Sequence, residues 1–251
     1  MITLFGDTIQ ESIDTIKKYS TQACELNPRG YNVAFSGGKD SIALLHLVKQ
    51  AGVPYFATYN VTGNDPPELV RFIRREYPEV KFIHPPKKFW QLVEEKGFFP
   101  MRNKRYCCEI LKELPIGEPC VTLVGVRSQE SKKRAKQSFM WDAKKRITIG
   151  CMQGHDNVTL RPIMHLLDVD IWSIISENNL PYPTDIYARQ KRIGCVFCPF
   201  SSSEEKAFYL IKYPQYAVKI NRLVKRLRDG GGGYRRYDKN YYIQTMEKIK
   251  L

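Results

Sequence analysis

The 251-residue sequence has no apolar run approaching the roughly 18 residues that a membrane-spanning helix needs, and no charged-then-apolar leader opens it. We therefore expect neither a membrane span nor export, and a cytoplasmic location. Disulfide chemistry is also poorly supported, because the seven cysteines are odd in number. In a reducing compartment they are more typical of metal ligands, reactive thiols or packed side chains.

Acidic residues are scarce in two segments. Residues 101–150 contain 12 Lys and Arg against 5 Asp and Glu, and residues 201–251 contain the same numbers, so each segment carries +7. Together they account for the whole net charge of +14. Because neutralised phosphates supply most non-specific nucleic-acid affinity, this placement suggests a polyanionic partner. A basic solvated surface explains the charge equally well.

The most informative stretch begins with a β-prone apolar run at Tyr31. The run ends at Ser36-Gly37-Gly38-Lys39-Asp40-Ser41, and a helical pattern with an apolar face follows. The glycines let the backbone approach an anion, the helix N-terminus presents unpaired N–H groups, and Lys39 adds a positive charge. The longer glycine spacing of the Walker loop is absent. We expect this turn to bind phosphate.

Strands and helices alternate around this turn. Strands are expected at about 31–35, 54–60, 80–83 and 121–126, with helices between the first three, which predicts a twisted parallel sheet covered by helices on both faces. The run 121–126 is fully apolar and is expected at the centre. Shorter β-like pieces lie at 146–149 and 158–160. We predict one domain over 1–200 and a basic helical extension over 201–251.

Helix boundaries are marked by acidic residues and glycines. Asp65, before Pro66 and Pro67, is expected to cap one helix, and Asp168 another. The extension is expected to be helical from about 203 to 228. A glycine hinge at 230–233 and a mobile tail rich in tyrosine and arginine should follow.

Four cysteines form two pairs, Cys107-Cys108 and Cys195-x-x-Cys198, with 86 residues between them. The second spacing suits zinc, an iron–sulfur cluster or dithiol redox chemistry. Adjacent cysteines fit one tetrahedral zinc poorly because successive side chains diverge, which favours a cluster over zinc or free thiols. The other three cysteines match no ligand spacing and are interpreted as packing residues.

Several of these motifs together resemble a known family. The hexamer 36–41 resembles the signature of PP-loop ATP pyrophosphatases. With 62–68, 102–108, 125–135, 161–163, 168–172 and 179–182, the chain resembles the phosphoadenosine phosphosulfate reductase family over roughly residues 25–200. The resemblance implies ATP and Mg²⁺ as cofactors and cleavage of ATP to AMP and pyrophosphate.

The resemblance also assigns roles to individual residues. It implies that Lys39 and Asp40 are catalytic, and that the nucleotide or its activated product is bound by Ser36, Gly37, Gly38, Ser41, Gly63, Arg127 and Arg134. The two cysteine pairs match the four-thiolate motif that holds a 4Fe-4S cluster in this family.

One difference from the reductases affects the expected activity. Their nucleophilic cysteine lies near the C-terminus, whereas no cysteine follows Cys198 here and the last histidine is His165. The family's sulfurtransferase-like members therefore fit better, with DNA phosphorothioation slightly ahead of tRNA thiolation. This implies a nucleic-acid substrate and a cysteine desulfurase as sulfur donor. A homodimer, a reductase that uses an external thiol and a non-catalytic nucleotide sensor are left open.

Overall fold

The computed structural model describes residues 2–3, 6–112 and 117–229. They form two compact units. The first contains the described residues up to 60, 71–83 and 117–186; the second contains 61–70, 84–112 and 187–229. The boundary predicted at residue 200 stays a prediction. The predicted hinge and tail, 230–251, lie outside the described residues.

The first unit is built on a seven-stranded sheet of order β5-β4-β3-β6-β9-β7-β8. The strands are β3 (Tyr31–Ala34), β4 (Tyr55–Asn60), β5 (Val80–Ile83), β6 (Cys120–Val124), β7 (Met140–Asp142), β8 (Ile147–Thr148) and β9 (Asn157–Leu160). The first five in spatial order are parallel, which confirms the predicted α/β class. The sheet is nevertheless mixed, because β7 and β8 pair antiparallel. Short loops suffice for such pairing, whereas parallel strands need a crossover.

The apolar strand β6 is the middle strand of the seven, as its composition predicts. Val121 and Leu123 are fully buried, as expected for a strand covered on both faces. Strand β3 lies beside it, with Val33 opposite Leu123, and β4 and β5 extend the sheet in the other direction. The strand order therefore reverses between β3 and β6. In open α/β sheets, ligands bind at the carboxyl ends of the strands at such a switch point.

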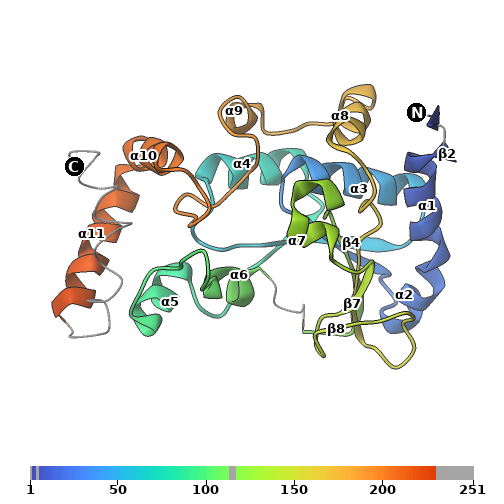
Figure 1. Ribbon diagram of the computed structural model, residues 1–251, viewed down its shortest axis with the longest axis horizontal. Helices are drawn as coiled ribbons and strands as arrows, with labels where there is room; N and C mark the ends of the chain where they lie inside the picture. The colour runs from blue at the N-terminus through green and yellow to red at the C-terminus, as the bar shows by residue number, and fades with distance from the viewer. Residues whose placement is uncertain (1, 4–5, 113–116, 230–251) are drawn as a thin grey trace. The chain divides into compact units, whose positions relative to one another are not determined.

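Helices of the first unit include α1 (Thr8–Lys18), α2 (Ser20–Leu26), α3 (Lys39–Ala51), α7 (Lys132–Ala135) and α8 (Asp168–Glu177). Helix α3 packs against both α1 and α8 (Figure 1). Its apolar face is buried, as the sequence pattern predicts. None of the described helices is long and apolar enough to cross a membrane.

The second unit has a hydrophobic core of its own. Its helices are α5 (Phe89–Lys96), α6 (Tyr106–Leu111), α10 (Ser203–Lys212) and α11 (Pro214–Asp229), while α4 (Pro67–Glu76) and α9 (Thr184–Tyr187) each have residues in both units. The core includes Trp90, Phe197 and Leu210, together with Ile220 and Leu223 from α11. The helical stretch expected over about 203–228 is observed, and it consists of two helices. It is interrupted at Tyr213 because Pro214 has no N–H to continue α10 and instead starts α11.

Neither of the two aspartates predicted to cap helices does so in the hydrogen bonds observed. Asp65 Oδ2 accepts from Thr62 N at 2.9 Å and from Thr62 Oγ1 at 2.8 Å, and so closes the turn before α4. At α8 the cap is Leu167, whose N–H donates to Asp170 Oδ2 at 2.7 Å. The carboxylate of Asp168 is thereby available for another contact.

Candidate functional site

The phosphate-binding turn predicted at 36–41 forms between β3 and α3 in the first unit. Gly37 has φ +71°, a conformation that residues with a side chain rarely adopt, and Gly38 is the N-cap of α3. The buried Ser41 hydroxyl donates to Gly38 O at 2.8 Å and accepts from Ser36 N at 3.1 Å. These bonds hold the turn in a fixed shape at the positive end of α3.

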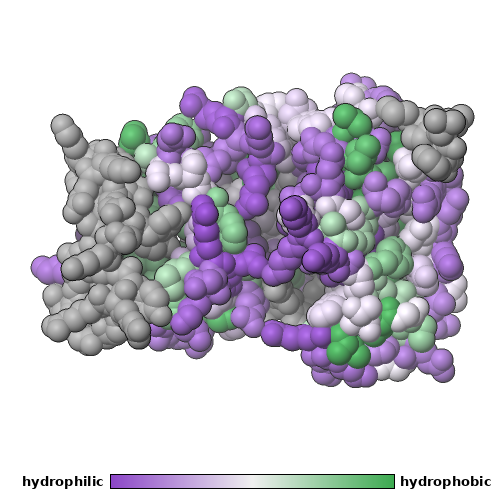
Figure 2. All heavy atoms as spheres, viewed as in Figure 1, coloured by the Kyte–Doolittle hydropathy of each residue, from purple (hydrophilic) through white to green (hydrophobic). Residues whose placement is uncertain are grey.

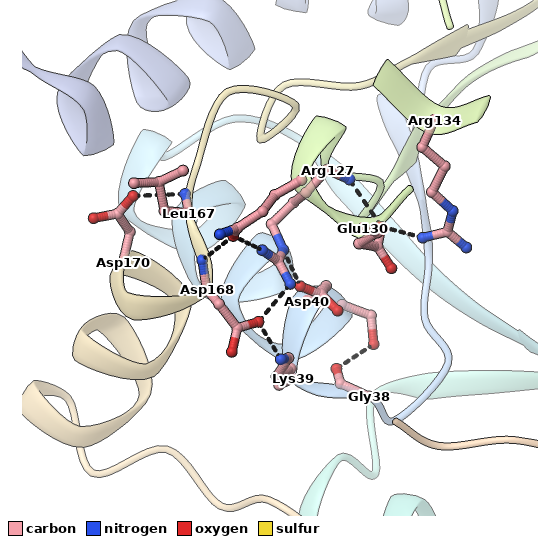
Figure 3. A network of polar contacts seen from close by, with 11 residues as sticks. Gly38, Lys39, Asp40, Arg127, Glu130, Arg134, Leu167, Asp168 and Asp170 are labelled. Atoms are coloured by element: carbon pink, nitrogen blue, oxygen red, sulfur yellow. Dashed lines mark hydrogen bonds and ion pairs between the residues drawn. The ribbon is translucent and has the colours of Figure 1, made fainter. Parts of the chain in front are cut away.

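Four charged side chains meet beside this turn (Figure 3). Arg127, which follows β6, donates through Nε to Asp40 and through Nη2 to Asp168 Oδ1 at 2.7 Å. Lys39 Nζ forms an ion pair with the same Asp168 oxygen. The network thus joins residues that follow β3 and β6, the two strands at the switch point, with a carboxylate from α8.

The exposure of these charges is uneven. The side chains of Arg127 and Lys39 are 4% and 10% exposed, whereas that of Asp168 is 45% exposed. Burial raises the pKa of Asp40 and outweighs the opposing effect of Arg127. Burial alone would also raise the pKa of Asp168, but Lys39 and Arg127 hold it below its ordinary value. Two buried cations are therefore neutralised by two carboxylates, one of them accessible to solvent.

The glycine after β6 allows this arrangement. A Cβ on Gly125 would lie 3.0 Å from the carbonyl carbon and oxygen of Asp40, closer than side chains normally pack. The end of β6 therefore approaches the first turn of α3 directly. This contact explains why a glycine precedes Arg127 in the motif.

Gln129 and Glu130 position the network from the other side. Gln129 Oε1 accepts from Arg127 Nη1 at 3.2 Å and from the Asp168 N–H at 2.8 Å. Glu130 accepts from the Arg127 N–H at 3.0 Å and forms an ion pair with Arg134. Arg134 therefore reaches the site only through Glu130 in the contacts described.

The structure brings most of the predicted nucleotide residues together in the first unit: Ser36, Gly37, Gly38, Lys39, Asp40, Ser41 and Arg127. Gly63, with φ +73°, lies in the second unit, in the turn that Asp65 closes. Sequence reasoning missed Asp168 as a partner of Lys39. The sequence did contain one signal. Asp168 and Asp170 both lie in the first turn of α8, and one carboxylate suffices to accept a hydrogen bond from the cap, so the second is available for another partner.

All four predicted cluster cysteines lie in the second unit, without disulfides. Cys107 and Cys108 are on α6, and Cys195 and Cys198 are in the turn before α10, where the Cys198 N–H donates to Cys195 O at 3.3 Å. A hydrogen bond with Cys108, burial and the other thiols raise the pKa of Cys107. Cys107 therefore lies within electrostatic reach of the other three thiols.

Charged side chains surround these thiols. Burial raises the pKa of Cys195 to about 11, although Lys112 lowers it through a hydrogen bond and its charge. The fully buried Lys206 donates to Ser201 O at 2.8 Å, and Arg102 donates to Pro199 O at 3.2 Å. Cations are therefore positioned to offset negative charge on thiolates.

In the described part of the chain, no three His, Cys, Asp or Glu side chains form a group that could hold a metal ion. Thiolates on a cuboidal cluster bind different iron atoms and stand farther apart than ligands of one ion. Four free thiols with neighbouring cations are a suitable donor set for such a cluster.

The mostly parallel sheet, with its phosphate turn at the switch point, defines a nucleotide-binding α/β protein of the PP-loop class. Comparison with known families is in agreement with this class. The chain belongs to the phosphoadenosine phosphosulfate reductase domain family, which it matches over residues 30–201.

Individual relatives of known sequence or structure share about a third or less of their residues with this chain. An uncharacterized protein of Methanocaldococcus jannaschii is 32% identical over 212 residues, which cover 77% of this chain and 41% of that protein. An adenosine 5'-phosphosulfate reductase of Lysinibacillus sphaericus is 24% identical over 177 residues, covering 66% of this chain and 71% of the reductase. The solved U34-tRNA thiolase NcsA from Methanococcus maripaludis with its 4Fe-4S cluster matches with 18% identity and a TM-score of 0.47, over 92% of this chain and 79% of that one. The chain thus spans less than half the length of the M. jannaschii relative.

Proposed function

We propose that the protein splits ATP into AMP and pyrophosphate in order to insert sulfur into a nucleic acid. The observation that carries this proposal is the pair of buried cations, Lys39 and Arg127, beside the PP-loop at the switch point of the sheet. Preorganised cations in a water-poor site stabilise the charge that develops on a leaving pyrophosphate. Mg²⁺ bound to the phosphates would share this task.

The proposed reaction has two steps. An oxygen of the nucleic acid attacks the α-phosphorus of ATP, the bond to the bridging oxygen breaks, and pyrophosphate leaves. Sulfide then takes the place of the activated oxygen, which departs with AMP. A cysteine desulfurase would deliver the sulfur as a persulfide, and a thiol reductant would release it as sulfide. Lys39 and Arg127 bind the phosphates, and the N–H groups at the start of α3 orient them.

The thiol site supports the sulfur half of the proposal. A 4Fe-4S cluster held by Cys107, Cys108, Cys195 and Cys198 would supply a place for sulfur to be held before transfer. Lys112, beside Cys195, would offset part of its negative charge. The reductase from L. sphaericus among the relatives also supports sulfur chemistry in this family.

Basic side chains support the nucleic-acid half. In the first unit, the exposed residues Lys132, Lys133 and Lys136 lie on α7 or directly after it. The surface over α7 is hydrophilic and is coloured purple in Figure 2. In the second unit, α11 buries Ile220 and Leu223 while the cationic residues Arg222 and Lys225 are exposed. DNA phosphorothioation stays slightly ahead of tRNA thiolation as the proposed outcome.

The decisive experiment is an anaerobic assay for AMP and pyrophosphate, with DNA, with tRNA and with neither. Nucleic-acid-dependent formation of both products, with ³⁵S from cysteine and a desulfurase entering one of the two polymers, is the expected result. The polymer that is labelled identifies the substrate. Release of ADP and phosphate would refute the proposal.

A second candidate is a sulfonucleotide reductase that takes its nucleophilic thiol from another chain. The similarity to the L. sphaericus reductase favours it. Release of sulfite from adenosine 5'-phosphosulfate in the presence of thioredoxin would establish it. A non-catalytic nucleotide sensor would bind ATP but yield no product in either assay.

A further inference from the structure

The carboxylate of Asp168 stands where an anionic ligand of the PP-loop is needed. Its Oδ1 accepts from Lys39 Nζ and from Arg127 Nη2, so that one oxygen bridges the two buried cations of the site (Figure 3). A phosphate oxygen bound beside the same turn would form these same two contacts. The carboxylate and a phosphate therefore compete for one position.

Of the two carboxylates in the network, Asp168 is the one able to leave. Its side chain is 45% exposed, against 20% for Asp40. When Asp168 is released, Arg127 keeps its contacts with Asp40 and Gln129 and stays in place. The contacts of Asp168 with Lys39 and Arg127 are thus the part of the network that solvent and ligand can reach.

The backbone around Asp168 does not depend on this carboxylate. Asp170, not Asp168, bonds the cap of α8, and Gln129 accepts from the Asp168 N–H. The side chain of Asp168 can therefore rotate away while the start of α8 remains fixed. An exchange of anions at the site requires no rearrangement of the helix.

We propose that Asp168 is an exchangeable counter-ion that occupies the phosphate position of the PP-loop, yields it to the phosphate chain of ATP and returns when pyrophosphate leaves. The identity of the arriving anion rests on the proposed function. Exchange of one anion for another keeps Lys39 and Arg127 neutralised at every stage, which avoids the cost of an unpaired buried charge. Because the Asp168 carboxylate competes with phosphate for Lys39 and Arg127, it weakens ATP binding and speeds the release of pyrophosphate. Asp168 is therefore a positioning residue.

The test is a binding measurement with inorganic pyrophosphate and with a non-hydrolysable ATP analogue, by calorimetry in phosphate-free buffer. Asp168→Asn and Asp168→Ser remove the competing charge, and both should lower the Kd for either ligand by about fivefold to tenfold. Asp168→Glu should retain the weaker binding. Glu177→Gln, which removes an exposed charge at the far end of α8, should bind as the unaltered protein does.

Turnover gives a second readout. If the ATP reaction proceeds, Asp168→Asn should lower KM for ATP and also lower kcat, because pyrophosphate is released more slowly. A purely structural ion pair would leave binding unchanged or weaken it, and that result in both neutral variants overturns the exchange. Absence of pyrophosphate binding in every variant overturns it as well. Tighter binding in the neutral variants without any AMP formation would uphold the exchange and refute the proposed reaction.

Discussion

The two candidate sites solve the problem of buried charge in opposite ways. In the first unit, Lys39 and Arg127 are neutralised by carboxylates of the protein itself, so the site is complete without a ligand. In the second unit, the thiols at Cys107 and Cys195 have raised pKa values because they are buried beside other thiols. A metal group bound there would have to displace the protons of Cys107 and Cys195.

This difference separates two kinds of dependence on ligand. A site with internal counter-ions is preformed, and the ligand must compete with them. A thiol site is held together by its metal, and the free energy of metal binding contributes to folding. Substitutions in the first unit should therefore change chemistry or affinity with little loss of structure, whereas substitutions of the cysteines should change composition and stability together.

The largest expected effect comes from Lys39→Ala. Loss of a preorganised cation beside the departing pyrophosphate should reduce AMP formation by about 10²–10³-fold, measured by chromatography of the nucleotides. Far-ultraviolet circular dichroism should be unchanged. Lys49→Ala is the matched control, because Lys49 lies on the same helix but forms an exposed ion pair with Glu79. Equal losses in the two variants would contradict the assignment of Lys39.

The second effect concerns the thiol site. Cys195→Ser should abolish the broad visible absorbance of anaerobically purified protein and lower its iron and sulfide content, whereas the exposed Cys151 should tolerate the same change. The melting temperature should fall for Cys195→Ser only, because metal binding contributes to folding. If the unaltered protein is colourless and contains one tightly bound zinc ion, the four cysteines form a structural zinc site and not a cluster site.

A smaller effect is expected on α7. Lys132 and Lys133 changed together to Gln should weaken nucleic-acid binding about tenfold and reduce the slope of log K against log salt by about 1.4–1.8, as loss of two phosphate contacts requires. Binding titrations over a range of salt concentrations measure both quantities. Lys17 and Lys18, also adjacent, exposed lysines of the first unit, serve as the paired control. An unchanged slope in the α7 variant would remove this helix from the interface.

The smallest effect is on stability. The lowered pKa of Asp168 means that its ionised form stabilises the fold. This contribution is complete above the ordinary pKa of an aspartate and is lost as the pH falls through the lowered value. Urea unfolding should show Asp168→Asn less stable by about 0.5–1 kcal/mol at pH 7, a modest value because the side chain is half exposed. The difference should shrink as the pH falls below the ordinary pKa of an aspartate, and a difference that stays constant over that range would show a cause other than charge.

The sequence predicts those features that depend on neighbouring residues. The fully apolar run at 121–126 predicts the central strand, and the hexamer at 36–41 predicts the phosphate turn, because both patterns are local. The apolar face of α11 follows its helical period in the same way.

Features that depend on distant partners were not predictable in this way. Strand β7 has only three residues and pairs with β9, so its alternation is too short to detect. Asp168 has an ordinary helix-start pattern, and its pairing with Lys39 spans 129 positions of sequence. Pro214 stands in the sequence as a helix breaker, but the helical patterns before and after it favour a helix across the whole stretch 203–228.

The edge of the sheet at β8 has a consequence for self-association. This strand is two residues long, and Lys144, Lys145 and Arg146 directly precede it, all exposed. Short edges bearing like charges repel the edges of other copies and offer few unpaired N–H and C=O groups for an added strand. Strand addition at β8 is therefore disfavoured as a route to aggregation, even though Ile147 is 46% exposed there. A homodimer formed by strand addition at this edge is disfavoured for the same reason.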